Sequence, residues 1–146
     1  MRDFYRNLRR SNTIKKARPN ILFIVFDQMR ADALIGPLAD TIELPNFTQF
    51  KNESVSFLNH FSVTSPCGPA RASLLTGQYA MNHRSVRNGT PLAHDTSNLA
   101  TSLNSKGIEP LLYGYTDTSQ DPRMYEQGDP ILTSYEEVLN GFTEAQ

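Results

Sequence analysis

The chain has 146 residues, 38% of them hydrophobic, and a formal net charge of −1. This length is sufficient for one domain with a packed core, and no apolar run approaches the length that crosses a bilayer. The single cysteine, Cys67, excludes an intrachain disulfide framework.

Charge is divided unevenly along the chain. Residues 1–18 hold seven basic side chains and one acidic one, whereas the rest holds seven basic and fourteen acidic ones. We expect a basic N-terminal extension over 1–18, flexible or loosely docked, and an α/β domain over 19–146. By its charge the arm could contact nucleic acid, an anionic membrane or an acidic partner subunit. Among the partners that we predict for the protein there is no nucleic acid. Because no apolar stretch follows the arm at once, we expect no secretory signal and a cytoplasmic location.

The first predicted element is a strand. The apolar run over residues 20–26 is typical of a strand that is buried on both faces of a parallel sheet. Asp27 and Gln28 follow directly, at the carboxyl end of the strand, where ligand sites of open α/β sheets lie. Asp27 could equally cap a helical turn over residues 30–34.

A helix and a second strand precede the cysteine. Pro45 and Asn46 are helix-start signals, and Phe47 and Phe50 fall on one face of that helix, so we assign both to the core. Residues 55–61 predict the second strand, with His60 as a structural histidine near its end.

Cys67 is predicted to lie at the start of a short helix that ends at Gly77. Pro69 fits the first turn, where its missing N–H costs nothing, and Arg71 lies about one helical turn after the cysteine. The helix N-terminus favours an anion. A sulfur atom beside an oxyanion-binding pocket is a plausible catalytic arrangement.

These residues carry a resemblance. Cys67, Pro69 and Arg71, followed by Leu-Thr-Gly at 75–77, resemble the signature of the sulfatases in the alkaline phosphatase superfamily. Met-Asn-His-Arg at 81–84 is similar to the phosphonate monoester hydrolase branch, which also cleaves phosphodiesters and sulfate esters. The resemblance runs from about residue 19 to about residue 142 and covers the N-terminal portion of the family's fold. It implies an alkaline-phosphatase-like α/β fold with a mostly parallel sheet and flanking helices.

The resemblance also implies a chemistry. In the family the cysteine is oxidised after translation to formylglycine, so a formylglycine-generating enzyme is an expected partner. A divalent cation, Ca²⁺ or Mn²⁺, is the expected metal. The implied roles are catalytic for Cys67 and Arg71, substrate-binding for Asn88 and Tyr115, and metal-ligating for Asp27, Gln28 and Cys67. His83 and Arg84 have weaker support and could only brace the motif helix.

The last part of the chain predicts further elements. Residues 96–107 read as an amphipathic helix, capped by Thr96 or Ser97, with Leu99 and Leu103 buried and Gly107 as its stop. Residues 109–115 read as a third strand that ends near the pocket, and a short helix is predicted over 134–140. Asp117 interrupts a threonine-rich stretch, so either it points away from an anionic substrate or specificity has changed.

We therefore expect a metal-dependent hydrolase of small sulfate esters, phosphonate monoesters or phosphodiesters, which could assemble as a homo-oligomer. The main alternative is a catalytically incomplete fragment or pseudoenzyme that acts as a binding module, because no histidine follows an aspartate to complete the metal site. A second alternative is a redox-responsive structural protein that uses Cys67 as a thiol. The isolated chain is expected to bind metal poorly and to turn over little substrate.

Overall fold

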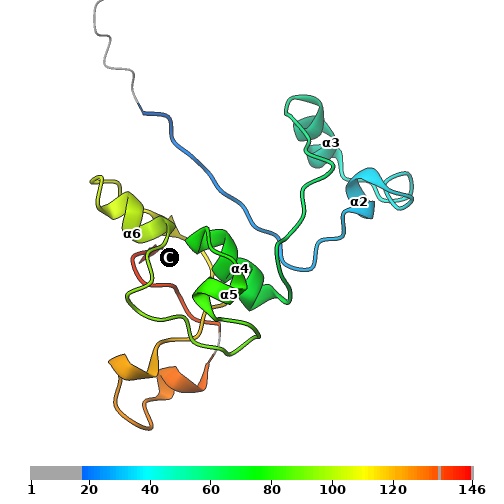
Figure 1. Ribbon diagram of the computed structural model, residues 1–146. Helices are drawn as coiled ribbons and strands as arrows, with labels where there is room; N and C mark the ends of the chain where they lie inside the picture. The colour runs from blue at the N-terminus through cyan, green and yellow to red at the C-terminus, as the bar shows by residue number, and fades with distance from the viewer. Residues whose placement is uncertain (1–17, 135, 146) are drawn as a thin grey trace, which may run out of the picture. The chain divides into compact units, whose positions relative to one another are not determined.

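The computed structural model describes residues 18–134 and 136–145, and the chain divides into two compact units, one ending at Glu43 and one beginning at Leu44. Figure 1 traces the chain through both units. The predicted basic extension lies, except for Arg18, outside the described residues. Among the described residues, no helix is long and apolar enough to cross a bilayer.

The strand predicted over residues 20–26 is absent from the first unit. Its side chains from Ile21 to Phe26 are 46–87% exposed, and the segment takes no part in any sheet of the described residues. The physical reason is that a strand exists only by pairing with a neighbour, and an apolar pattern cannot supply that neighbour. The first unit does hold α2 (Asp32–Ile35), whose N-cap is Ala31, so Asp27 does not cap it.

The second unit begins with α3 (Pro45–Asn52), which starts at the predicted proline. The core assignment of its aromatics is wrong for Phe50, which is 68% exposed, while Phe47 is half-buried. The second predicted strand is also absent: residues 55–61 are irregular and exposed, His60 included. As in the first unit, the described residues provide no pairing partner for this segment.

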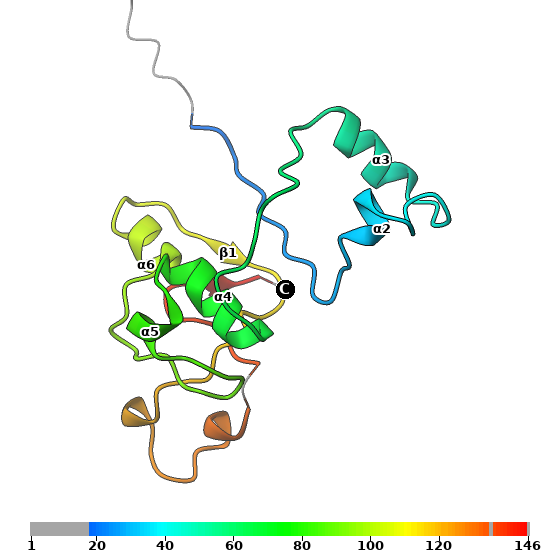
Figure 2. The same ribbon diagram turned by 45° about the vertical axis from the view of Figure 1, so that its right-hand side comes forward.

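Three helices build the core of the second unit. They are α4 (Cys67–Thr76), α5 (Ala80–His83) and α6 (Leu99–Asn104), and α4 contacts both of the others (Figure 2). Ala72 of α4 and Ala100 of α6 are fully buried, as is Pro69. Small side chains at these positions allow the helices to approach closely.

Helix α6 is shorter than predicted and is capped by a different residue. The Asn98 side chain accepts a hydrogen bond from the Thr101 N–H, and the Thr101 hydroxyl accepts one from the Asn98 N–H, each at 3.0 Å. This reciprocal capping box satisfies two backbone donors, so neither Thr96 nor Ser97 is needed as a cap. The predicted stripe is only partly right, because Leu99 is 42% exposed and Ala100 is the buried residue.

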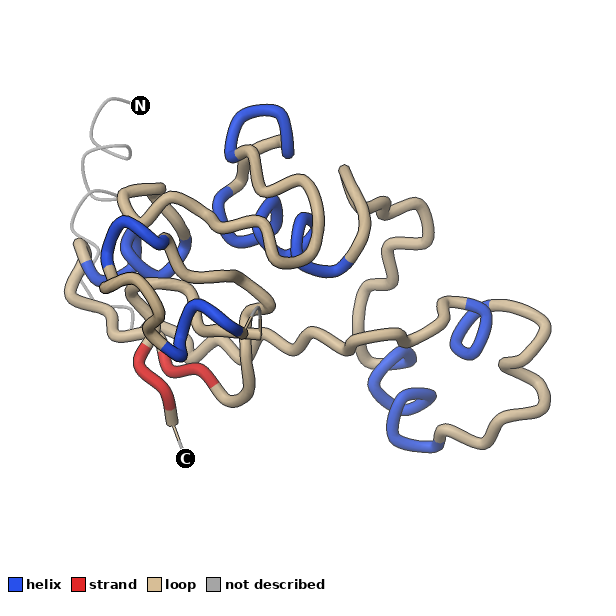
Figure 3. Tube along the Cα trace, turned by 90° about the horizontal axis from the view of Figure 1, so that it is seen from below, coloured by secondary structure: helices blue, strands red, loops and turns tan. Residues whose placement is uncertain are grey.

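The second unit also contains a small parallel sheet of two strands. It pairs β1 (Leu111–Leu112) with β2 (Thr143–Glu144), the two strands shown side by side in Figure 3. The third predicted strand, over 109–115, is thus confirmed for two residues only. The helix predicted over 134–140 is wrong, since Glu137 forms an antiparallel bridge with Thr118 instead. Helices with a parallel sheet agree with the predicted α/β class.

Two 3₁₀ helices, η1 (Pro122–Met124) and η2 (Pro130–Thr133), lie between β1 and β2 in the chain. Each begins with a proline that follows an aspartate N-cap. The Asp121 and Asp129 carboxylates accept hydrogen bonds from the N–H groups of Arg123 and Ile131, both at 3.0 Å. Aspartate caps and prolines in the first turn explain why the chain turns here.

Candidate functional site

Helix α4 presents Cys67 as its first residue. Pro66 is the N-cap, Pro69 lies in the first turn, and Gly77 ends the helix in the left-handed conformation at φ 68°. These are the start and stop that the sequence predicts. Cys67 is a free thiol that is partly exposed, at a helix end where backbone N–H groups favour negative charge.

The side-chain amide of Asn88 holds the start of this helix. Its Nδ2 donates to Cys67 Sγ at 3.1 Å, and its Oδ1 accepts from the Gly68 N–H at 3.0 Å. The two contacts fix the orientation of the amide, because only one of its ends can donate. Asn88 therefore presents a hydrogen-bond donor to the side chain of residue 67.

Gly68 makes this approach sterically possible. A Cβ atom added at Gly68 would lie 3.0 Å from Asn88 Oδ1 and 3.1 Å from the carbonyl oxygen of Asp117. Both distances are tighter than ordinary van der Waals contact. Asp117 itself is buried and has a φ of 57°, so the segment after β1 reaches the motif helix through its backbone.

Arg71 lies one helical turn after Cys67 and contacts Tyr115. Its Nη1 donates to the Tyr115 carbonyl oxygen at 3.2 Å, and its Cζ lies 4.9 Å from the centroid of the Tyr115 ring. This is a cation–π geometry. The two contacts hold the positive charge of Arg71 on the same helix as Cys67.

Four of the six predicted site residues therefore meet in the second unit as two contacting pairs, Cys67 with Asn88 and Arg71 with Tyr115. Asp27 and Gln28 belong to the first unit, where both are exposed and Gln28 has a φ of 56°. Over residues 18–134 and 136–145, no three His, Cys, Asp or Glu side chains group to hold a metal ion. The assignment of Asp27, Gln28 and Cys67 as metal ligands stays a prediction.

His83 braces the motif helix, as its place in the sequence suggests. Its Nε2 lies 2.9 Å from the hydroxyl of Ser73 on α4, and its Nδ1 accepts a hydrogen bond from the Ser85 N–H at 3.1 Å. The side chain is buried, and burial lowers the pKa of His83 below its ordinary value because the charged form is desolvated. The neutral ring is therefore favoured.

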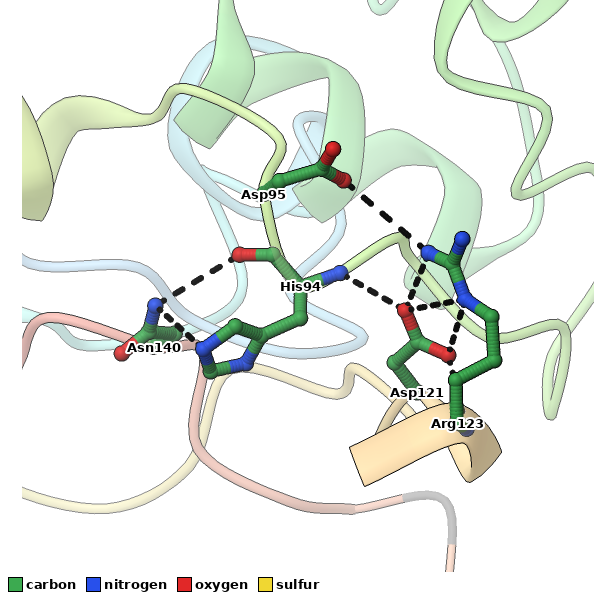
Figure 4. A network of polar contacts seen from close by, with 5 residues as sticks. All are labelled: His94, Asp95, Asp121, Arg123 and Asn140. Atoms are coloured by element: carbon green, nitrogen blue, oxygen red, sulfur yellow. Dashed lines mark hydrogen bonds and ion pairs between the residues drawn. The ribbon is translucent and has the colours of Figure 1, made fainter. Parts of the chain in front are cut away.

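Sequence reasoning missed a second polar network, shown in Figure 4. Asp121 accepts from the backbone N–H of His94 at 3.0 Å and pairs with Arg123, whose Nε lies 2.9 and 3.0 Å from its two carboxylate oxygens. The Arg123 guanidinium holds the pKa of Asp121 well below its usual range. Arg123 also lies 3.9 Å from Asp95, and Asn140 contacts His94. The Asp-Pro turn signal at 121–122 could have indicated the cap, but not the contact with a residue far away in the chain.

Comparison with known proteins identifies the class. The model of the sulfatase family matches residues 19–143, so the chain belongs to the sulfatase family. This confirms the resemblance on which the site residues were chosen. The family generally uses a divalent metal ion and a formylglycine.

Two solved structures are similar to this chain. The solved phosphonate monoester hydrolase of Silicibacter pomeroyi is 61% identical, with a TM-score of 0.82 over 87% of this chain and 25% of that chain. The enzyme of the same name from Agrobacterium radiobacter is 46% identical, with a TM-score of 0.80 over 88% of this chain and 26% of that one. These likenesses confirm the alkaline-phosphatase-like α/β fold.

A third relative is named as a member of the alkaline phosphatase superfamily. The multifunctional alkaline phosphatase superfamily protein PehA of Trinickia caryophylli is 42% identical over 130 residues, which cover 86% of this chain and 25% of PehA. The chain thus spans about a quarter of the length of each of these three relatives.

Proposed function

We propose that this chain carries the nucleophile of a hydrolase that cleaves sulfate esters, phosphonate monoesters or phosphodiesters through a formylglycine formed from Cys67. The observation that carries the proposal is the contact between Asn88 Nδ2 and Cys67 Sγ at the start of α4. It supports the proposal because a donor aimed at the reacting atom is what stabilises an oxyanion there.

Each of the four clustered residues has a part in this chemistry. A formylglycine at position 67 would supply a geminal diol, one hydroxyl attacking the ester and the other releasing the product. Asn88 would hold the oxygen that takes the place of the sulfur. Arg71 would place a positive charge one helical turn away, and Tyr115 would hold that guanidinium and contact the substrate.

The remaining roles are proposals of the same kind. Asp27, Gln28 and Cys67 would be ligands of Ca²⁺ or Mn²⁺, but a hard cation needs more oxygen ligands than these three residues supply. A small-molecule ester, a formylglycine-generating enzyme and a second copy of the chain are the proposed partners, and the cytoplasm is the proposed location.

A binding module without turnover is the second candidate. The observation that favours it is that two features suited to an anion, the start of α4 at Cys67 and the Arg71 guanidinium, lie on one helix. Such a chain would keep the anion-favouring end of α4 and the Arg71 charge, and would bind an ester without cleaving it. The thiol-based structural role has no separate structural support.

Activity of the protein that carries this chain in its host separates these candidates. We expect hydrolysis of a phosphonate monoester or of a matched sulfate ester, and we expect Cys67→Ala to abolish it. The two phosphonate monoester hydrolases make the phosphonate the first ester to test. A folded protein that binds the ester, with no turnover above the Cys67→Ala control, would overturn the hydrolase proposal and favour the binding module.

A further inference from the structure

The His83 side chain contacts two segments of the chain, the motif helix α4 and the stretch that leads to Asn88. It is the last residue of α5 and is 6% exposed. One of its ring nitrogens contacts Ser73 on the motif helix, and the other contacts Ser85, at the start of the segment that leads to Asn88.

The direction of each hydrogen bond follows from the chemistry of the ring. The Ser85 N–H can only donate, so His83 Nδ1 must be the unprotonated nitrogen. A neutral ring then carries its proton on Nε2 and donates it to the Ser73 hydroxyl, 2.9 Å away. A Ser85 N–H could not donate to a charged ring, because both nitrogens of that ring would carry protons.

The segment after His83 is held as a closed loop. Arg84 takes the left-handed conformation at φ 62°, which a side chain other than glycine adopts only at some cost. The contact from Ser85 to His83 spans this residue. The Ser85 hydroxyl donates to the Thr90 carbonyl oxygen at 2.8 Å, and the Thr90 N–H donates to the Arg87 carbonyl oxygen at 3.0 Å. Asn88 lies inside this loop.

We propose that His83 is a positioning residue for Asn88, because it joins the motif helix through Ser73 to the loop that carries Asn88 through Ser85. The proposal deepens the proposed function by assigning what holds the donor against residue 67. His83 does not touch the reacting atoms. Its effect passes through the Asn88 side chain to Cys67 and to the Gly68 N–H.

The Gly68 N–H offers a local readout of this effect. It lies in the first turn of α4, where a helix supplies no internal acceptor, and Asn88 Oδ1 accepts its hydrogen at 3.0 Å. Amide hydrogen exchange at Gly68 therefore reports whether Asn88 is in place. The Ser102 N–H, bonded to the Asn98 carbonyl oxygen at 3.0 Å in α6, serves as the internal reference for general loosening.

The experiment measures exchange by NMR on the full chain, in the wild type, four single variants and one double variant. In His83→Gln, the Nε2 of the glutamine can still donate to Ser73. No atom then takes the place of His83 Nδ1 as the acceptor of the Ser85 N–H. Ser73→Ala removes the other contact with a smaller change in packing, so it serves if His83→Gln does not fold. Asn88→Ala removes the acceptor itself, and His60→Gln changes an exposed histidine as the matched control.

We expect His83→Gln and Ser73→Ala each to raise the exchange rate of Gly68 relative to Ser102 by about fivefold, the scale of one lost hydrogen bond. We expect Asn88→Ala to raise it at least as much and His60→Gln to leave it unchanged. In the double variant His83→Gln/Asn88→Ala, the ratio should equal that of Asn88→Ala alone. Additive effects, or equal acceleration at Gly68 and Ser102, would overturn the proposal. Because the exchange needs neither formylglycine nor substrate, its result is independent of whether the hydrolase proposal holds.

Discussion

Asn88 and Cys67, 21 residues apart in the chain, meet through a hydrogen bond of 3.1 Å from the asparagine amide to the sulfur. The same amide accepts the Gly68 N–H, so one side chain orients both the reactive atom and the backbone of the first helical turn. Whatever occupies position 67 is presented with a donor from this side.

Replacing the donor should affect chemistry more than folding. Asn88→Asp keeps an oxygen that accepts the Gly68 N–H but places a carboxylate against residue 67. We expect kcat/KM of the protein that carries this chain to fall by about 10²–10³-fold, as when an oxyanion donor is removed. The thermal midpoint should stay close to that of the wild type. An activity loss matched by a large fall of the midpoint would show that Asn88 is structural.

Adding a methyl group at Gly68 should strain the site. The Cβ atom of Gly68→Ala would lie 3.0 Å from Asn88 Oδ1 and 3.1 Å from the backbone oxygen of Asp117, and the backbone cannot easily move. We expect the free energy of unfolding to fall by about 1–3 kcal/mol, the usual cost of overpacking. Urea unfolding measures it, with Ser102→Ala on the exposed surface of α6 as the control. Equal stability of both variants would contradict the steric argument.

Tyr115 has two proposed roles, to hold Arg71 and to contact the substrate, and two substitutions separate them. Tyr115→Phe keeps the ring and the carbonyl oxygen that contact Arg71, whereas Tyr115→Ala removes the ring. We expect Tyr115→Ala to lower the free energy of unfolding by about 0.5–1 kcal/mol more than Tyr115→Phe, through lost cation–π attraction. If the hydroxyl binds substrate, Tyr115→Phe should raise KM at unchanged stability. An unchanged KM for Tyr115→Phe would remove the substrate-binding role.

Stability should depend on pH through His83. Burial lowers the pKa of His83 in the folded protein, while the unfolded chain protonates near about 6.5. Below that pH the unfolded state binds more protons at His83 than the folded state does. The contribution of His83 to the free energy of unfolding is therefore complete above about pH 6.5 and is lost progressively as the pH falls. We expect His83→Gln to reduce the loss of stability between about pH 7.5 and 5 in urea unfolding. His60→Gln should leave it unchanged, and an identical loss in His83→Gln and the wild type would contradict the assignment.

The sequence predicted those parts of the fold that depend on local chemistry. The limits of α4 follow from Pro69 in its first turn and Gly77 at its end, and the structure confirms both. The structure likewise confirms that α3 starts at Pro45, as its local proline signal predicts. In each case the signal and the element that it controls lie within a few residues of one another.

Elements that depend on distant partners could not be predicted in this way. Residues 20–26 have the apolar pattern of a buried strand, yet they belong to no sheet of the described residues. The contact of Asn88 with Cys67 has no local signal either. Asn88 was selected by resemblance to the family, and the geometry that brings it to the sulfur came from the structure. The Ser73 contact of His83 was missed for the same reason, since a helical serine looks like any other surface position.

The most direct measurement is the mass of the peptide that contains residue 67, taken from the protein made in its native host. The account predicts a loss of about 18 Da at Cys67, the change from thiol to aldehyde, with Arg71 and Asn88 unmodified. A free thiol at Cys67 that an alkylating reagent labels completely, in a host that has the formylglycine-generating enzyme, would contradict it.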